Sequence, residues 1–292
     1  MSHVTVDPLS PPDTLPRTAV TTKPRFDARR VYVGLAALPI LYGLIVVAPP
    51  IGVLVLALVS ALLAAREFFR LHLGTRPMPP AFLLGFAGIA LVLAAGHWPE
   101  LLPLHTVSIL TLLGIMCTVL LTSNPADSRL HDAAVALLGV AYLGLTLFFA
   151  IRLRAGPDGA WLVCVLLIVT FAADTGAYYA GVLFGRHALA PRISPKKTVE
   201  GLVGGWVLSL VAALALRAWL LPAWSLLDCL WVSLLLTGSG LLGDLVESAL
   251  KRSAGVKDSG HLLPGHGGML DRIDSLLFTA PTFYYYVTLV NG

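Results

Sequence analysis

A dense group of charged side chains lies near the carboxyl end of this otherwise apolar chain. Between residues 244 and 274, acids and bases alternate and glycines separate them. The charged or titratable residues of this group are Asp244, Glu247, Lys251, Arg252, Lys257, Asp258, His266, Asp271, Arg272 and Asp274. Carboxylates can hold a hard cation, and Lys and Arg can hold phosphate. The segment therefore predicts metal-dependent chemistry on a phosphorylated substrate.

The spacing within this group indicates which side chains act together. Residues three and four positions apart share one face of a helix. The residues spaced in this way are Asp244, Glu247, Ser248 and Lys251. Two carboxylates on that face can hold Mg²⁺, and the lysine a turn further on can reach the phosphate. Asp271 and Asp274 repeat the spacing. The simpler alternative is an ion pair within one helix at its end.

A second polar segment precedes an apolar run at residues 194–201. Thr198 can cap a helix beginning near Val199, and Glu200 favours that helix start. A helix N-terminus flanked by Lys196 and Lys197 is suited to binding a phosphate group. Alternatively, the two lysines anchor the end of a span at anionic lipid.

Two further features can belong to the same site. Asp174 lies within an apolar run. Burying a carboxyl group in a membrane costs free energy, so such a residue indicates a functional site. The alternative is that Asp174 makes a structural hydrogen bond. The run Gly265–Gly268 contains His266, Gly267 and Gly268; its glycines permit positive φ and close approach of the backbone to a ligand. The alternative interpretation of His266 is an ordinary loop residue.

The composition requires these side chains to be positioned by membrane helices. The chain is 57% hydrophobic and 12% charged, whereas soluble domains carry about 25% charged residues. We therefore expect an all-α, polytopic integral membrane protein with about nine transmembrane helices. The candidate spans are 31–48, 51–68, 81–97, 103–122, 133–151, 160–183, 200–221, 226–248 and 275–290. Of these, 51–68 is short and could be re-entrant.

The positions of lysine and arginine predict the orientation. With nine spans and a cytoplasmic N-terminus, 17 of the 20 lysines and arginines fall in cytoplasmic segments, as the positive-inside rule expects. Asp174, the 194–201 segment and the 244–274 segment then meet at the cytoplasmic side, where we place the active site. The net charge of +4 is thus a topology signal, and we expect no nucleic acid partner.

The chain is expected to divide into three parts. Residues 1–30 are rich in proline and lack an apolar run, which predicts a disordered tail and argues against a secretory signal. Residues 31–155 are expected to form the N-terminal transmembrane helices. Residues 156–292 are expected to form a catalytic transmembrane region with cytoplasmic loops.

The charged segment also resembles a known family. Ser248 to Arg252, Lys257-Asp258 and the run Leu-Pro-Gly-His-Gly-Gly-Met-Leu-Asp-Arg-Ile-Asp ending at Asp274 are similar to the signature of the phosphatidate cytidylyltransferases, or CDP-diacylglycerol synthases. Asp-Thr-Gly-Ala-Tyr at 174–178 and Ile-Ser-Pro-Lys-Lys-Thr-Val-Glu-Gly at 193–201 also resemble that family. The specific match covers roughly residues 174–274.

The resemblance implies a reaction and its partners. CTP and phosphatidic acid would give CDP-diacylglycerol and pyrophosphate in a lipid bilayer, with Mg²⁺ that K⁺ can accompany, in a homodimer of the bacterial plasma membrane. Asp244 and Asp271 would be the leading metal ligands, with Glu247 and Asp274 completing the shell. The expected catalytic residues are Lys251, Arg252, Lys257, Asp258, His266 and Arg272. The expected substrate-binding residues are Asp174, Ser194, Lys196, Lys197, Thr198, Glu200, Gly267 and Gly268.

Two rival functions predict different products or different features of the sequence. A CTP-using polyprenol kinase would share the nucleotide and the metal but form CDP and a lipid phosphate. An ion or solute transporter would show charges at the membrane midplane on broken, repeated helices. The charges of this chain instead cluster at one face, and the sequence shows no internal repeat.

Overall fold

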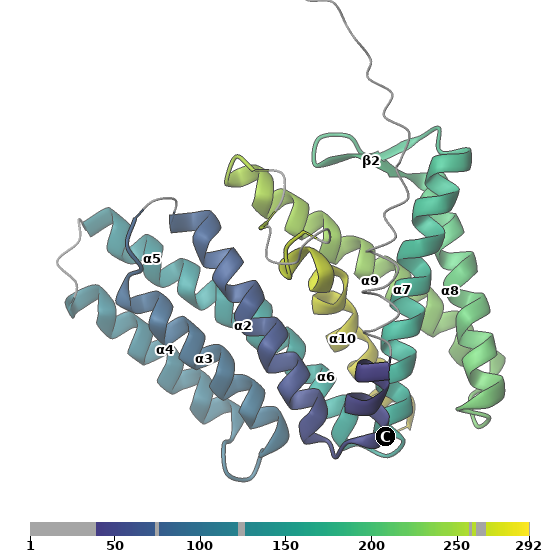
Figure 1. The fold of residues 1–292 in the computed structure, drawn as a ribbon, viewed down its shortest axis with the longest axis horizontal. Helices are drawn as coiled ribbons and strands as arrows, with labels where there is room; N and C mark the ends of the chain where they lie inside the picture. Colours follow the sequence, from purple (N-terminus) through teal and green to yellow (C-terminus); the bar gives the residue numbers. More distant parts are fainter. Residues whose placement is uncertain (1–38, 74–75, 122–125, 257–258, 261–266, 292) are drawn as a thin grey trace, which may run out of the picture.

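The computed structural model describes residues 39–73, 76–121, 126–256, 259–260 and 267–291, and helices dominate them (Figure 1). The helices of the first part are η1 (Gly43–Val47), α2 (Ile51–Leu73), α3 (Pro80–His97), α4 (Leu104–Leu121), α5 (Ala126–Gly139), η2 (Val140–Leu145) and α6 (Thr146–Ala155). The remaining elements are α7 (Gly159–Phe184), β1 (Ala188–Ala190), β2 (Ser194–Thr198), α8 (Val199–Trp219), α9 (Leu226–Ser253) and α10 (Leu270–Asn291).

The predicted membrane architecture is confirmed at the level of an integral membrane protein. Among the described residues, seven helices are long and apolar enough to cross a membrane. They correspond to the second through eighth predicted spans. The apolar run at 51–68 continues to Leu73, giving a helix of 23 residues, and the fifth span is a continuous helical stretch, Ser128–Ala155.

The first and last predicted spans are not among these seven helices. Residues 31–38 of the first predicted span lie outside the described residues, and the described part, 39–48, contains a helical stretch that ends with η1. The run 275–290 falls in α10, whose sequence is less apolar and which is not one of the seven candidates. The count of nine spans therefore stays a prediction, as does the cytoplasmic position of the site.

One departure from an all-helical chain lies before α8. β1 and β2 pair antiparallel, with Ala188 opposite Thr198 and Ala190 opposite Ser194. The sequence predicted a loop here. The hairpin has a physical reason: the carboxylate of Glu200 accepts hydrogen bonds from the backbone N–H groups of Arg186 and His187, at 3.0 and 3.2 Å, and so holds β1 near the start of α8.

Two hydrophobic clusters form the core, and α10 contributes to both. The first cluster joins α2 to α6 and includes Leu270, Ile273 and Leu277 of α10. The second joins α7, α8 and α9 and includes Ala280 and Phe283. In Figure 1, α10 accordingly runs between the two groups of helices. The start of α10 is thus positioned by the N-terminal helices, although its acidic residues face the other group.

Small residues bring α7 and α8 close together. A Cβ atom placed on Gly204 would lie 2.1 Å from the Cβ of Ala180, and one placed on Gly176 would lie 2.5 Å from the carbonyl oxygen of Gly204. Only glycine leaves room for such an approach, as in membrane helix pairs generally. The pair carries Asp174 and the start of α8 as one unit.

Candidate active site

A cavity of about 420 Å³ opens among β2 and helices α7 to α10. The predicted site residues that line it are Asp174, Ser194, Lys196, Lys197, Thr198, Asp244, Asp271 and Asp274. The segment around Asp174, the 194–201 segment and the 244–274 segment therefore meet as the sequence predicted, and the cavity contains both lysines of β2 and carboxylates of three helices.

Three carboxyl groups form a cluster suited to a cation. Asp244, Glu247 and Asp274 each offer an oxygen, and these atoms lie within 4.8 Å of one another. Glu247 is 1% exposed, and its Oε1 atom is buried without a hydrogen-bond partner among the described residues. Carboxylate oxygens at this separation fit a hard divalent cation such as Mg²⁺. Three of the four predicted metal ligands thus come together.

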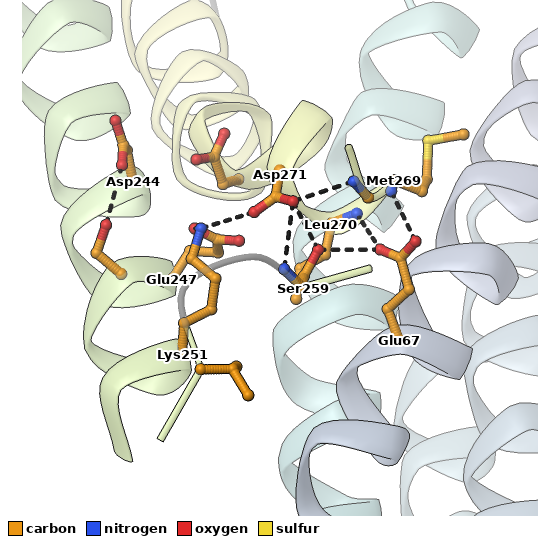
Figure 2. Close-up of polar contacts among 12 residues, drawn as sticks. Glu67, Asp244, Glu247, Lys251, Ser259, Met269, Leu270 and Asp271 are labelled. Carbon is orange, nitrogen blue, oxygen red and sulfur yellow. Dashed lines mark hydrogen bonds and ion pairs between the residues drawn. The ribbon is translucent and has the colours of Figure 1, made fainter. Parts of the chain in front are cut away.

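The fourth predicted ligand, Asp271, is held by hydrogen bonds (Figure 2). Its Oδ1 accepts a bond of 2.6 Å from the ammonium of Lys251, and its Oδ2 accepts bonds from Ser259 Oγ at 2.9 Å and from the Gly268 N–H at 3.1 Å. Burial raises the pKa of Asp271, but its interactions with Glu247, Lys251 and Ser259 outweigh burial and hold that pKa below its ordinary value. Asp271 is therefore an ionised group beside the cluster.

Lys251 links the cluster to Asp271. Its ammonium lies 2.5 Å from Glu247 Oε2 and 2.6 Å from Asp271 Oδ1, and its side chain is 13% exposed. The i, i+4 pair of Glu247 and Lys251 is the intrahelical ion pair considered above, but the contact with α10 extends it into a network between two helices. Lys251 can therefore fix α9 against α10 as well as supply positive charge.

The β2 segment places its cations as the sequence indicated. The Thr198 hydroxyl accepts a hydrogen bond of 3.1 Å from the Gly201 N–H and caps α8, which begins at Val199. Lys197 forms an ion pair with Asp244 across the cavity, and Lys196 also lines it. Glu200, predicted to bind substrate, lies outside the cavity lining and also pairs with the ring of His187, 2.5 Å away.

Other predicted residues lie around this centre or outside the described part. Arg252 is exposed and donates to the carbonyl of Val256 at 3.1 Å, and Arg272 is also exposed. Gly267 has the positive φ that was predicted, +79°, just before the start of α10. Lys257, Asp258 and His266 lie outside the described residues.

Glu67, which belongs to α2 and reaches the same network, was not among the predicted site residues. Its carboxylate accepts hydrogen bonds from Ser259 Oγ and from the backbone of α10 (Figure 2). A lone acid in an apolar run is the signal that drew attention to Asp174. Arginines at 66 and 70 flank Glu67, so its surroundings also resemble an ordinary span end.

Comparison with known proteins shows the family. The cytidylyltransferase family matches residues 28–290. A Staphylococcus saprophyticus protein named phosphatidate cytidylyltransferase is 38% identical over 238 residues, covering 79% of this chain and 88% of the relative. A Staphylococcus aureus protein of the same name is 36% identical over 233 residues, covering 78% and 86%. The chain therefore belongs to the cytidylyltransferase family and is a nucleotidyltransferase of the membrane.

Proposed function

We propose that this protein transfers CMP from CTP to phosphatidic acid, forming CDP-diacylglycerol and pyrophosphate. The observation that carries the proposal is the cavity in which Lys196 and Lys197 face a carboxylate cluster at one end of a membrane helix bundle. The names of the relatives give the substrates, and the resemblance of the 174–274 segment agrees with them.

The chemistry that this site must perform is the joining of two anions. A phosphate oxygen of the lipid attacks the α-phosphorus of CTP, forming a P–O bond. The bond from that phosphorus to the oxygen bridging it to the β-phosphorus breaks, and its electron pair leaves with pyrophosphate. The attacking oxygen already carries negative charge at neutral pH, so a strong general base is not required. Positioning and charge neutralisation then supply most of the catalysis.

Side chains of the chain divide these tasks between them. Lys196 and Lys197, on β2, neutralise phosphate charge at the cavity wall, and the start of α8 behind Thr198 adds its backbone N–H groups. Lys251 holds Asp271 and Glu247 in place. Asp174, which accepts a 3.5 Å hydrogen bond from Ser275 Oγ, borders the cavity opposite β2.

Asp244, Glu247 and Asp274 are the residues that would hold Mg²⁺. When bound, the ion supplies positive charge that offsets the triphosphate and stabilises the departing pyrophosphate. Asp271, the other leading ligand expected from the resemblance, lies one turn of α10 before Asp274 and accepts a hydrogen bond from Lys251. K⁺ as a companion ion and a homodimeric assembly are further parts of the proposal, carried by the resemblance.

The membrane setting determines how the lipid arrives. Because its acyl chains stay in hydrocarbon, phosphatidic acid enters sideways between helices, and its headgroup reaches the cavity at the end of the bundle. The distribution of lysine and arginine supports a cytoplasmic position for that end and for the N-terminus. CTP, a soluble nucleotide, would reach the cavity from the same side.

A product assay tests the proposal. Purified protein in detergent receives phosphatidic acid, α-labelled CTP and Mg²⁺, with an Asp274→Asn variant beside it. We expect label in a lipid product, lost when the metal is chelated and strongly reduced in the variant. Label that appears only in CDP would instead identify a lipid kinase. Absence of CTP turnover with every metal tried would favour the transporter. A cytidylylated protein trapped by rapid quenching would contradict direct transfer.

A further inference from the structure

Glu67 supplies hydrogen-bond acceptors to the start of a helix 203 positions away in the sequence. The Met269 N–H donates to its Oε1 at 3.0 Å, and the Leu270 N–H donates to its Oε2 at 2.8 Å (Figure 2). The first N–H groups of a helix lack partners within the helix, and negative charge is favourable there. The side chain is 6% exposed, so Glu67 anchors the start of α10 inside the protein.

The same carboxylate is linked to the site through one hydroxyl. Ser259 Oγ lies 3.2 Å from Glu67 Oε2 and 2.9 Å from Asp271 Oδ2. Asp271 in turn accepts the bond from Lys251, which also contacts Glu247 of the carboxylate cluster. A continuous series of polar contacts therefore runs from α2 to the cluster.

The local backbone leaves no free space around this anchor. A Cβ atom placed on Gly268 would lie 2.0 Å from Ser259 Oγ and 2.6 Å from Glu67 Oε2. One placed on Gly260 would lie 2.9 Å from Glu67 Oε1. The two glycines thus permit the close approach of the chain to the carboxylate, which explains at least one glycine of the charged motif without invoking a ligand.

We propose that Glu67 is a positioning residue that sets the start of α10 and so places Asp271 and Asp274 in the site. Glu67 is not among the residues lining the cavity, so it acts through α10 rather than on substrate. The inference rests on the proposed function, because it assigns these aspartates a part in that site. It also makes the N-terminal helices, outside the charged motif, part of the machinery that shapes it.

Glu67→Gln tests the inference with little change of volume. Both carboxylate oxygens of Glu67 accept N–H donors, so an amide places an NH₂ group against one of them. In metal-free protein, we expect faster hydrogen exchange in the peptide covering residues 267–275. We also expect the affinity for Mn²⁺, measured by electron paramagnetic resonance, to fall about 10- to 100-fold, and kcat to fall by a similar factor. Losses of this size are typical when a group that orients metal ligands is removed.

Asp132→Asn is the matched control. Asp132 is 2% exposed, belongs to α5 in the same half of the molecule, and pairs with Arg76 at 3.2 Å. The substitution also converts a buried carboxylate to an amide, and thermal melting shows how much stability each variant loses. Asp132→Asn should leave exchange at 267–275, Mn²⁺ binding and kcat at their wild-type values.

Gly268→Ala provides a second approach if Glu67→Gln fails to fold. Its methyl group would push the backbone of 268–270 away from Glu67 without removing the carboxylate, and it should produce the same three changes. The inference would be overturned if folded Glu67→Gln showed the wild-type rate of hydrogen exchange at 267–275. It would also be overturned if exchange became faster while Mn²⁺ binding stayed unchanged. If the wild-type protein transfers no CMP, the proposed function fails, while exchange and Mn²⁺ binding still decide the role of Glu67.

Discussion

Lys197 is the cation whose removal most directly tests charge neutralisation at the site. It lines the cavity and forms an ion pair with Asp244. We expect Lys197→Ala to lower kcat about 10²- to 10³-fold, the range for loss of one group that stabilises developing charge. Mn²⁺ binding should not weaken, because the change removes a positive charge beside a metal ligand. Steady-state kinetics and paramagnetic resonance measure the two effects.

Arg192→Ala serves as the control for that prediction. Arg192 is exposed in the turn of the same hairpin and is not among the residues lining the cavity. The variant loses the same unit of charge from the same segment, so kcat should stay within about twofold of wild type. An equal loss of kcat in both variants would show that the general charge of the hairpin matters, rather than the position of Lys197.

Substitution of Asp244 tests whether Mg²⁺ binding depends on the carboxylate cluster or on any acidic residue of α9. We expect Asp244→Asn to raise the Mg²⁺ concentration needed for half-maximal activity at least about 10-fold, because one of three clustered carboxylates is lost. Asp228→Asn is matched: the residue lies at the opposite end of α9 and bonds to Tyr286 and Ser225. That variant should lose about 1 kcal/mol of stability with its helix cap but keep the metal requirement. Magnesium titrations of activity, together with melting curves, measure both effects.

At the residue scale, the sequence was informative where partners are close along the chain. The i, i+3 and i, i+4 spacing of Asp244, Glu247 and Lys251 predicted a shared face, and the ion pair and the cluster confirm it. The choice between Asp271 and Asp274 beside Asp244 could not be made from spacing, since it depends on how α10 is rotated. That rotation involves Glu67, whose partners are about 200 positions away.

At the scale of elements, the contact between α7 and α8 is sensitive to side-chain size. We expect Gly204→Ala to lower the melting temperature, because its methyl would overlap Ala180; overpacking of this kind costs about 1–3 kcal/mol. Gly238→Ala, in α9, introduces the same methyl into open space and should leave the melting temperature unchanged or higher. Thermal unfolding in detergent, followed by tryptophan fluorescence, compares the two. A lower melting temperature in both would contradict the close-packing explanation.

The elements show what hydrophobic patterns can and cannot predict. Apolar runs located the helices from α2 to α9, because each run must be buried in lipid or protein whatever its neighbours do. The β1–β2 hairpin was not predicted, since its strands are short and it is held by Glu200 from the following helix. The capping of α8 by Thr198 was predicted, because a cap is a contact across only three residues.

At the scale of the whole molecule, the two hydrophobic clusters explain why the site needs both halves of the chain. Residues 31–155 and 156–292 were predicted to be separate regions, and only the second carries the family motif. Leu270, Ile273 and Leu277 of α10 nevertheless pack into the cluster formed by the first part. Sequence alone could not show this, because an apolar helix face does not specify which other helix covers it.

The orientation of the molecule in the membrane is the remaining whole-molecule prediction. β2 and the turn between α6 and α7 lie at opposite ends of α7, so they should face opposite sides (Figure 1). With Cys117, Cys164 and Cys229 changed to Ala, we introduce Arg192→Cys or Gly156→Cys and treat intact spheroplasts with a membrane-impermeant maleimide. The excess of lysine and arginine near β2 predicts that it faces the cytoplasm. Arg192→Cys should therefore react only after permeabilisation, and Gly156→Cys before it. The reverse pattern would place the cavity outside, away from cellular CTP, and would contradict the proposed function as well as the orientation.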